Sequence, residues 1–476
     1  MPRGFKKRGT KHPAGLAVLC ICTALCLALT GCQVFFQWDD PVPYVSPRPT
    51  AEPTEHPSGT PEATDFPTAE PTQEPTQEPN QEPTPEPSSE PTPGLADLPT
   101  ETPGVMTASL GFAGDVLLMQ AQIAAANTGS GYDFKDMFRP MQALFESVDF
   151  MVLNFEGTLA GAAAGYTQPK PTEIPATEDN PNPPKLFQRF NAPDEIVDDL
   201  MALGVDGFST ANNHCLDKGV EGLLRTIKVM DEKGAFHTGT FASMERFNTA
   251  DIVDINGIKV GFVSATHSVN SYDAVLTQEQ SRYMVTRLYN DSMTSGAIAR
   301  CREQGAELVV VMAHWGRQYQ QELNYDQQEY TQKLIGWGAD AIIGCHPHVI
   351  QTIKWVTGSR EGRAVTVPVA YSMGNFISNM SRANYPVDIG MFVRLDVKKT
   401  SMGAEVTGIS CVPTYDYIHT VGGRYINEVI PCFDDMSGVP SLAGLGQAQA
   451  GIQRARQHCK SLAGADVPMI KNPLIG

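Results

Sequence analysis

The chain has 476 residues and a formal net charge of −18, and neither its charge nor its 36 prolines are spread evenly. Residues 33–104 carry a net charge of −13 and residues 41–104 hold 18 of the prolines, whereas residues 105–476 carry −10. This acidic remainder has no Lys/Arg cluster, which argues against a nucleic-acid partner because phosphate binding needs concentrated positive charge.

The N-terminal segment, residues 1–31, has the pattern of a bacterial secretion signal. Five basic residues precede an apolar run from Ala14 to Leu29, which is shorter than the roughly 20 residues of a permanent membrane helix. The run ends in Leu-Thr-Gly-Cys32, which resembles the lipobox of bacterial lipoproteins, so we expect cleavage before Cys32 and lipidation of its thiol. An ordinary cleaved signal and an uncleaved anchor helix are the alternatives. All three place the rest of the chain outside the cytoplasmic membrane, and the lipobox predicts a lipid-anchored protein of the cell membrane.

Residues 32–104 are predicted to be a disordered linker that begins at the lipidated cysteine. Glu-Pro-Thr and Gln-Glu-Pro units repeat through this segment. Proline favours extended polyproline geometry and like-charged glutamates repel one another, so the linker is expected to be a stretched, solvated spacer between the membrane and the folded part.

Beyond residue 104, short apolar runs alternate with amphipathic segments. The runs predict strands at 108–118, 150–153, 205–210, 252–255, 258–264, 307–313, 341–344, 351–356, 364–372, 390–397 and 405–411. The amphipathic segments predict helices at 138–148, 192–203, 218–233, 293–304, 325–337 and 445–463. Asn256-Gly257 is a strong hairpin signal, and Gly234 is expected to cap the helix before it.

The order of these elements predicts the fold class and the division of the chain. An α/β region leads into a more antiparallel β region, which is typical of a layered α/β sandwich with helices on the outside. We expect one folded domain over residues 105–435 and a helical tail over residues 436–476. Cysteines are scattered without a Cys-x-x-Cys pair, so the sequence leaves disulfide connectivity open, with Cys411 and Cys432 as the first pair to test.

Clusters of His, Asn, Asp and Glu follow six of the predicted strands. In open α/β sheets, ligands bind at the carboxyl ends of the strands. The clusters, in chain order, are Gly114-Asp115, Asn154-Phe155-Glu156-Gly157, Asn212-Asn213-His214, His314-Trp315-Gly316, His346-Pro347-His348 and Gly374-Asn375-Phe376. A single histidine of this kind is usually structural, but four at successive strand ends, with two carboxylates and an amide, indicate a metal site.

The residue types predict which metals would bind. Carboxylate, amide and imidazole ligands without a thiolate favour Mn, Fe, Zn or Mg over copper or an iron–sulfur cluster. Two carboxylates, three histidines and an amide are too many ligands for one tetrahedral zinc, and they suit two metals about 3.5–4 Å apart with a bridging carboxylate. Such a pair is suited to the hydrolysis of a phosphoester.

The ordered motifs resemble one family of proteins. Gly-Asp115, Asn-x-Glu156, Ala-Asn-Asn-His214, His314-Trp-Gly and Gly-x-His-Pro-His348-Val together resemble the bacterial capsule synthesis protein CapA family, also called poly-γ-glutamate biosynthesis proteins. The resemblance covers about residues 108–376. That family is similar to calcineurin-like metallophosphoesterases, which implies a four-layer α/β/β/α sandwich with one or two divalent metal ions.

The resemblance also implies ligands for each metal. Asp115 and His348 would bind the first metal. Asn213, through its amide oxygen, would bind the second metal together with His314 and His346.

Further residues take roles around the two metals by the same resemblance. Glu156 would bridge both metals. His214, beside the metals without being a ligand, would protonate a leaving group or stabilise charge in the transition state. Asn154, Asn375 and Trp315 would lie behind the ligands or face the substrate.

One departure from the phosphoesterase pattern leaves two hypotheses open. The pattern has Asp-x-His at the first strand, whereas this chain has Leu117 at the histidine position, so the first metal has one protein ligand fewer. The first hypothesis is a metal-dependent hydrolase acting on an anionic envelope polymer or a phosphoester substrate. The second is a non-catalytic accessory subunit of a membrane polymer synthase or export complex, with a vestigial metal site.

Overall fold

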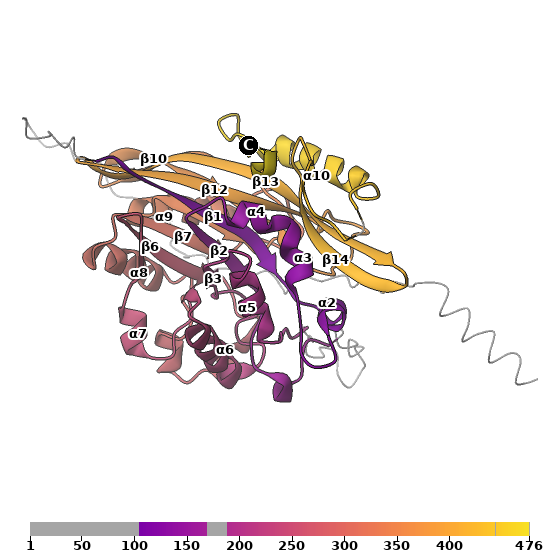
Figure 1. Cartoon of the computed structure of the whole chain (residues 1–476). Coiled ribbons are helices and arrows are strands. Elements are labelled where there is room, and N and C mark those ends of the chain that lie inside the picture. The colour runs from indigo at the N-terminus through magenta and orange to yellow at the C-terminus, as the bar shows by residue number, and fades with distance from the viewer. Residues whose placement is uncertain (1–103, 169–187, 443, 476) are drawn as a thin grey trace, which may run out of the picture. The chain divides into compact units, whose positions relative to one another are not determined.

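The structure is a computed structural model that describes residues 104–168, 188–442 and 444–475 (Figure 1). The predicted signal peptide, the lipidation site at Cys32 and the linker lie outside the described residues, so these assignments stay predictions. Among the helices of the described ranges, none combines the length and the apolar character that crossing a bilayer requires.

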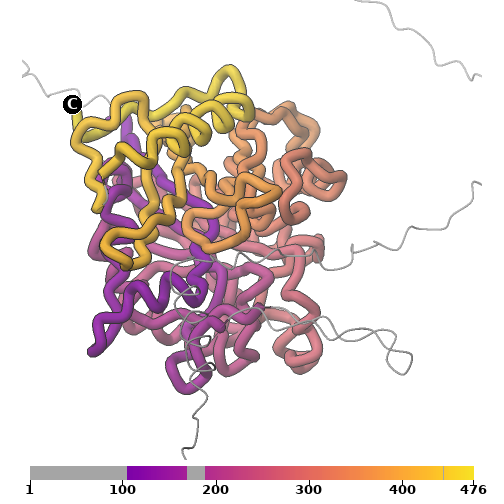
Figure 2. The backbone as a smooth tube through the Cα atoms, turned by 90° about the vertical axis from the view of Figure 1, so that its right-hand side faces the viewer, coloured from indigo at the N-terminus to yellow at the C-terminus, as the bar shows by residue number. Residues whose placement is uncertain are grey.

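The larger sheet has eight strands in the order β14-β13-β12-β1-β2-β3-β4, with β11 paired to β1. Strands β1 to β4 are parallel to one another, and β12, β13 and β14 extend the sheet as an antiparallel meander. The strands are β1 Met106–Val116, β2 Phe150–Phe155, β3 Gly207–Ser209, β4 Phe236–Thr238, β11 Asn375–Ile377, β12 Ile389–Thr400, β13 Gly403–Val421 and β14 Arg424–Pro431. The first described strand therefore lies beside strands from the C-terminal part of the chain (Figure 2).

The smaller sheet has six strands in the order β5-β6-β7-β8-β10-β9. Its central strands β6, β7, β8 and β10 are parallel, and an antiparallel hairpin closes each edge. The strands are β5 Asp251–Ile255, β6 Ile258–Thr266, β7 Leu308–His314, β8 Ala341–Cys345, β9 Ile353–Arg360 and β10 Arg363–Ala370. The hairpin predicted at Asn256-Gly257 is confirmed, because both residues have the positive φ angles, 54° and 83°, of a two-residue turn between β5 and β6.

Helices cover the outer faces of the two sheets (Figure 1). The α-helices are α2 Gln120–Ala126, α3 Lys135–Phe138, α4 Gln142–Phe145, α5 Glu195–Met201, α6 Gly219–Lys233, α7 Met244–Asn248, α8 Asp291–Glu303, α9 Tyr325–Trp337 and α10 Gln449–Leu462. Short 3₁₀ helices lie at Arg139–Met141, Ala162–Ala164, Tyr272–Val275, Gln280–Arg282 and Pro473–Ile475. Helix α6 ends at Gly234 in the left-handed conformation, as predicted.

Three apolar cores define the layers of the domain. The central core lies between the sheets, where Phe112 and Phe150 of the larger sheet meet Phe262 and Val310 of the smaller one. A second core joins the outer face of the larger sheet to α3, α4 and α5, and a third joins the smaller sheet to α8 and α9. The predicted α/β fold with two sheets is confirmed, and these cores are compatible with the four-layer order α/β/β/α.

One predicted helix is broken into short pieces. Residues 138–148 were expected to form a continuous helix, but α3 ends at Phe138, a 3₁₀ turn covers Arg139–Met141, and α4 ends at Phe145. Pro140 explains the break, because proline cannot donate the backbone hydrogen bond that a continuous α-helix needs at that position.

The C-terminal segment packs on β13 of the larger sheet and also bonds to Ile353 of β9 in the smaller sheet. Helix α10 contacts β13, and its Ile452 and Ala455 belong to the central core together with Ile409. All six cysteines of the described residues are buried free thiols, so the disulfide considered between Cys411 and Cys432 is not formed. The Sγ atom of Cys411 instead lies 3.8 Å from that of Cys459 on α10.

Candidate metal centre

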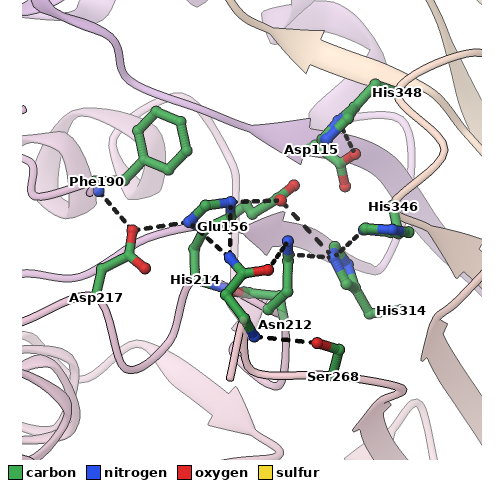
Figure 3. Close-up of polar contacts among 12 residues, drawn as sticks. Asp115, Glu156, Phe190, Asn212, His214, Asp217, Ser268, His314, His346 and His348 are labelled. Carbon is green, nitrogen blue, oxygen red and sulfur yellow. Dashed lines mark hydrogen bonds and ion pairs between the residues drawn. The ribbon is translucent and has the colours of Figure 1, made fainter. Parts of the chain in front are cut away.

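The predicted site residues come together at the carboxyl ends of the parallel strands of both sheets (Figure 3). In the larger sheet, Asp115 at the end of β1 is in register with Asn154 of β2 and with Asn375 of β11. In the smaller sheet, His314 at the end of β7 is in register with Cys345, which directly precedes His346. Parallel strands thus deliver residues that are remote in sequence to one buried cluster.

Two groups of three residues in this cluster have the spacing of metal ligands. Asp115, Glu156 and His348 form one group, and Glu156, His314 and His346 form the other. In each group the ligand atoms lie within 4.8 Å of one another, and all five residues are buried. Glu156 is common to both groups, which is the position expected of a bridging carboxylate.

Glu156 lacks hydrogen-bond partners although it is fully buried. Among the described residues, neither of its carboxylate oxygens accepts a hydrogen bond. The nearest cationic candidates are Nε2 of His314 at 3.7 Å and Nε2 of His214 at 3.9 Å. Burial raises the pKa of Glu156 well above its usual range, and the nearby charges of Asp115 and Asp217 add to this effect. A buried carboxylate with two unsatisfied oxygens is costly unless a cation completes it, so the site fits a divalent metal.

The histidines on the second side of Glu156 are arranged as neutral ligands. Nε2 of His314 lies 2.8 Å from the amide oxygen of Asn213 and 3.2 Å from Nδ1 of His346. Burial lowers the pKa of both His314 and His346 well below the ordinary value, and neighbouring imidazoles add to the shift. Neutral imidazole is the form that binds metals.

On the first side, amide groups orient the ligands. The Nδ2 group of Asn154 donates to Oδ1 of Asp115 at 2.7 Å. Nδ1 of His348 lies 3.1 Å from Oδ2 of Asp115 and 2.9 Å from Oδ1 of Asn375, and since both oxygens are acceptors, Nδ1 carries the proton. Asn154 and Asn375 therefore contact two of the candidate ligands, Asp115 and His348.

The backbone at the ligands is tightly constrained. His346 and His348 have φ angles of 100° and 58°, a region that non-glycine residues occupy rarely and at a cost. At Gly114, a Cβ atom would lie 1.8 Å from the carbonyl oxygen of Gly374, so only glycine allows the two chain segments to approach beside Asp115.

His214 is held beside the cluster by an aspartate that the sequence analysis missed. Nδ1 of His214 lies 2.7 Å from Oδ2 of Asp217, and that oxygen also accepts the backbone N–H of Phe190 at 2.6 Å. The Phe190 ring packs edge-on against the imidazole with 4.6 Å between centroids. Asp217 follows His214 by three residues, and this short spacing on one loop was the available signal. The imidazole is fixed with Nε2 toward Glu156 (Figure 3).

Two further residues come from the end of β6, which the sequence analysis did not inspect. Oδ1 of Asn270 accepts a hydrogen bond from Nδ2 of Asn213 at 3.2 Å. The backbone N–H and Nδ1 of His267 both point to the carbonyl oxygen of His314, at 2.9 and 3.0 Å, and its ring lies 4.4 Å from that of His346. Burial lowers the pKa of His267 to about 4. The rule that ligands gather at parallel strand ends would have found both residues.

Two positions beside the motifs face away from the metal cluster. Trp315 is fully buried in the core of the smaller sheet, where its indole N–H donates to the carbonyl oxygen of Tyr371 at 2.9 Å. Trp315 therefore contributes to the packing of that core. Leu117 packs in an apolar cluster with Phe190 and Val349, so hydrophobic contacts occupy the place of the missing histidine.

Comparisons with known proteins give one family and several relatives. The family model described as "Bacterial capsule synthesis protein PGA_cap" matches residues 109–380. The capsule biosynthesis protein CapA of Bacillus anthracis is 27% identical over 191 residues, which are 40% of this chain and 44% of that protein. The PGA biosynthesis protein CapA of Bacillus subtilis is 23% identical over 283 residues, 58% of this chain and 66% of that protein. The alignments thus span less than two thirds of either relative.

Solved structures with similarity to the chain are distant. The calcineurin-like phosphoesterase YfkN from Bacillus subtilis is 16% identical with a TM-score of 0.37, and the match covers 75% of this chain and 100% of that one. The sulfate thiohydrolase SoxB from Thermus thermophilus is 11% identical with a TM-score of 0.33, covering 67% and 47% respectively.

Proposed function

The chain belongs to the bacterial capsule synthesis protein family PGA_cap, and from that premise we propose that it is a metal-dependent hydrolase of the phosphoester type. We place its action in the synthesis of capsule, poly-γ-glutamate or another cell-envelope polymer. The predicted lipid anchor at Cys32 would hold it on the outer side of the cell membrane, where its substrate would be an anionic envelope polymer or a phosphoester.

The observation that carries the proposal is the sharing of Glu156 by two groups of candidate ligands. A structural carboxylate buried this deeply would have its oxygens satisfied by hydrogen bonds, whereas those of Glu156 accept none among the described residues. Glu156 belongs to both candidate groups, with Asp115 and His348 in one and His314 and His346 in the other. This arrangement supports two divalent cations bridged by one carboxylate.

Each of the chain's own residues has a distinct task in this proposal. Divalent ions held here would supply Lewis-acid chemistry to a phosphoester and a nucleophile at neutral pH. Asp115 and His348 would hold the first ion, and Asn213, His314 and His346 would hold the second.

His214 is the proposed proton donor to the leaving group. The Asp217 carboxylate accepts its Nδ1 proton and so fixes the tautomer and the direction of the ring. Nε2 then faces Glu156, the centre of the metal cluster, at 3.9 Å. Because Asp217 is itself buried, the pair is a rigid unit in which the imidazole needs no rearrangement before the proton is transferred.

Turnover and metal content test the proposal together. We expect the purified protein with added manganese to hydrolyse a generic aryl phosphate monoester or diester. His314→Ala should abolish turnover and reduce the metal bound per chain, whereas His458→Ala, a histidine of α10 outside the cluster, should change neither. Absence of turnover by the wild-type protein with Mn, Fe, Zn and Mg would refute the hydrolase, and a metal stoichiometry of two, one or zero would define the centre.

A second function, that of a non-catalytic accessory subunit, is favoured by Leu117. An apolar side chain stands where the phosphoesterase pattern has a histidine ligand, so the first metal would bind weakly. In this proposal the protein assists a membrane polymer synthase or export complex and keeps a vestigial metal site. Leu117→His separates the two functions: a gain of metal and of turnover from a silent wild type would favour the accessory subunit, whereas a wild type already active without the histidine would exclude it.

A further inference from the structure

Two cationic side chains on the His214 side of the cluster form no ion pair with an acidic residue of the described ranges. Arg189 is exposed and directly precedes Phe190, and Lys218 is half-buried and directly follows Asp217. Within the ranges that the structure describes, neither forms an ion pair. Nε of Arg189 donates instead to the hydroxyl of Tyr272 at 3.1 Å, and Nζ of Lys218 donates to the carbonyl oxygen of Ala164 at 3.0 Å.

The backbone beside both cations is fixed by the residues that hold His214. The Oδ2 atom of Asp217 accepts the N–H of Phe190 and contacts Nδ1 of His214 (Figure 3). The Asp217 carboxylate therefore has two tasks. It orients His214, the proposed proton donor, and it links the backbone beside Arg189 to the backbone beside Lys218. The backbone from which these two side chains extend is therefore held beside His214 by a buried hydrogen bond.

Arg189 is oriented before any ligand arrives. Its guanidinium lies 5.5 Å from the ring centroid of Tyr272, and the Nε bond to the hydroxyl of the same residue fixes its plane. The two terminal nitrogens have no hydrogen-bond partner among the described residues. A planar guanidinium held at one edge presents its other edge for a two-point contact with a carboxylate or phosphate.

The two cations also lie close enough to repel each other. Burial lowers the pKa of Lys218, and the Arg189 charge adds to the shift against the attraction of Asp217. Asp217 does not neutralise them by direct pairing, because its Oδ2 serves His214 and Phe190 and no cationic nitrogen of Arg189 or Lys218 lies within ion-pair distance. Two like charges held together in this way are stabilised when an anion binds between them.

We propose that Arg189 and Lys218 bind a second anionic group of the substrate, a carboxylate or a phosphate separate from the group at the metal centre. The inference rests on the proposed function and deepens it, because it makes the substrate a polyanion. Since the two cations lie on the side of His214, the second anion would belong to the leaving-group portion of the substrate.

Binding of defined polyanions tests this without requiring turnover. A glutamate polymer and inorganic polyphosphate are titrated into the full-length, metal-supplemented protein by calorimetry. For Arg189→Ala combined with Lys218→Ala, we expect affinity to fall about tenfold to hundredfold, as charge-assisted hydrogen bonds are lost. The control combines Arg363→Ala with Lys471→Ala, two exposed cations elsewhere, which removes the same net charge and should leave affinity unchanged.

The outcomes separate the two proposals. Equal losses in both double variants, or no binding of either polymer by the wild type, would overturn the polyanion inference. A loss confined to the Arg189/Lys218 variant supports it even if the protein hydrolyses no phosphoester, in which case only the hydrolase proposal fails. Preference for one polymer identifies the second anion as carboxylate or phosphate. Arg189→Lys with Lys218→Arg should restore most of the affinity, and equal thermal midpoints of all variants verify that each is folded.

Discussion

Replacing Glu156 with glutamine should stabilise the metal-free protein and remove its response to metal. The substitution keeps the shape of the side chain but removes a carboxyl group whose ionisation is opposed by burial and by the nearby carboxylates of Asp115 and Asp217, and whose oxygens have no hydrogen bond among the described residues. A neutral amide can donate to Asp115, so repulsion becomes attraction. The stability of the metal-free protein should therefore rise while metal binding is lost. This combination is expected of a residue whose role is to bind a metal rather than to stabilise the fold.

The size of both effects follows from the burial of Glu156. An unsatisfied buried polar group costs about 1–3 kcal/mol, and more if it is charged, so Glu156→Gln should raise the free energy of unfolding of the metal-free protein by about that amount. A metal at about 100 times its Kd stabilises the wild type by about 2.7 kcal/mol. Glu156→Gln should lose most of this gain, since both ligand groups contain Glu156.

Thermal unfolding at about pH 8, with chelator and then with manganese, measures the stability of the metal-free protein and the stabilisation by metal. The matched control is Glu428→Gln, because Glu428 is equally buried but accepts hydrogen bonds from the Ser441 hydroxyl and the Leu442 backbone at 3.0 and 2.8 Å. This control should destabilise the protein and keep the metal response. If Glu156→Gln destabilises the metal-free protein as Glu428→Gln does, and manganese still raises its midpoint, the reasoning about the shared carboxylate is wrong.

Three further predictions concern other parts of the domain. Asp217→Asn should lower turnover about 100-fold with metal content unchanged, because His214 loses its orienting acceptor; equal turnover of the variant would contradict this. Burial raises the pKa of Asp416 to about 6 from 3.8, so the folded state holds this proton more tightly than the unfolded state and stability falls as pH rises between these values. Denaturant unfolding at several pH values should show this loss, about 3 kcal/mol, in the wild type relative to Asp416→Asn. Gly114→Ala should cost about 3 kcal/mol or more, because its Cβ would meet the Gly374 carbonyl, and a normal unfolding midpoint would refute the close approach.

The sequence predicted the elements whose apolar pattern is local. Helix α9 was placed at the residues where the structure has it, Tyr325 to Trp337, because its apolar period is regular and Asn324 caps its start. The turn at Asn256-Gly257 was likewise determined by its own residues. Where a single residue interrupts the pattern, as Pro140 does, the expected helix divides.

Long-range pairing could not be obtained in this way. Strand β13 extends to Val421 and pairs with β14, but the predicted strand ended at Cys411, because the buried polar residues Thr414 and Asp416 interrupt the apolar pattern of the sequence there. The pairing of β12 with β1, which is remote in sequence, depends on the whole sheet.

The candidate ligands were predictable because parallel strands direct their ends to one edge. Asp115, Glu156 and His348 were chosen by that rule, and the structure brings them together. His267 directly follows β6, so the same rule applies to it, whereas Asp217 acts through a neighbour by contacting His214. Such a contact between two side chains depends on the geometry of the loop, which no periodic pattern in the sequence predicts.

The pairing of β1 with β12 has a consequence for any attempt to excise the family region. The matched residues end at 380, whereas β12 begins at Ile389 and lies along β1 from Met106 to Ala113. A polypeptide restricted to the matched residues would keep the candidate ligands but lack β12. One edge of β1 would then expose unpaired backbone N–H and C=O groups, which favours aggregation. A truncated protein for expression should therefore include the meander of β12, β13 and β14. In homologues, the boundaries should be chosen from the pairing of strands rather than from the extent of the motifs.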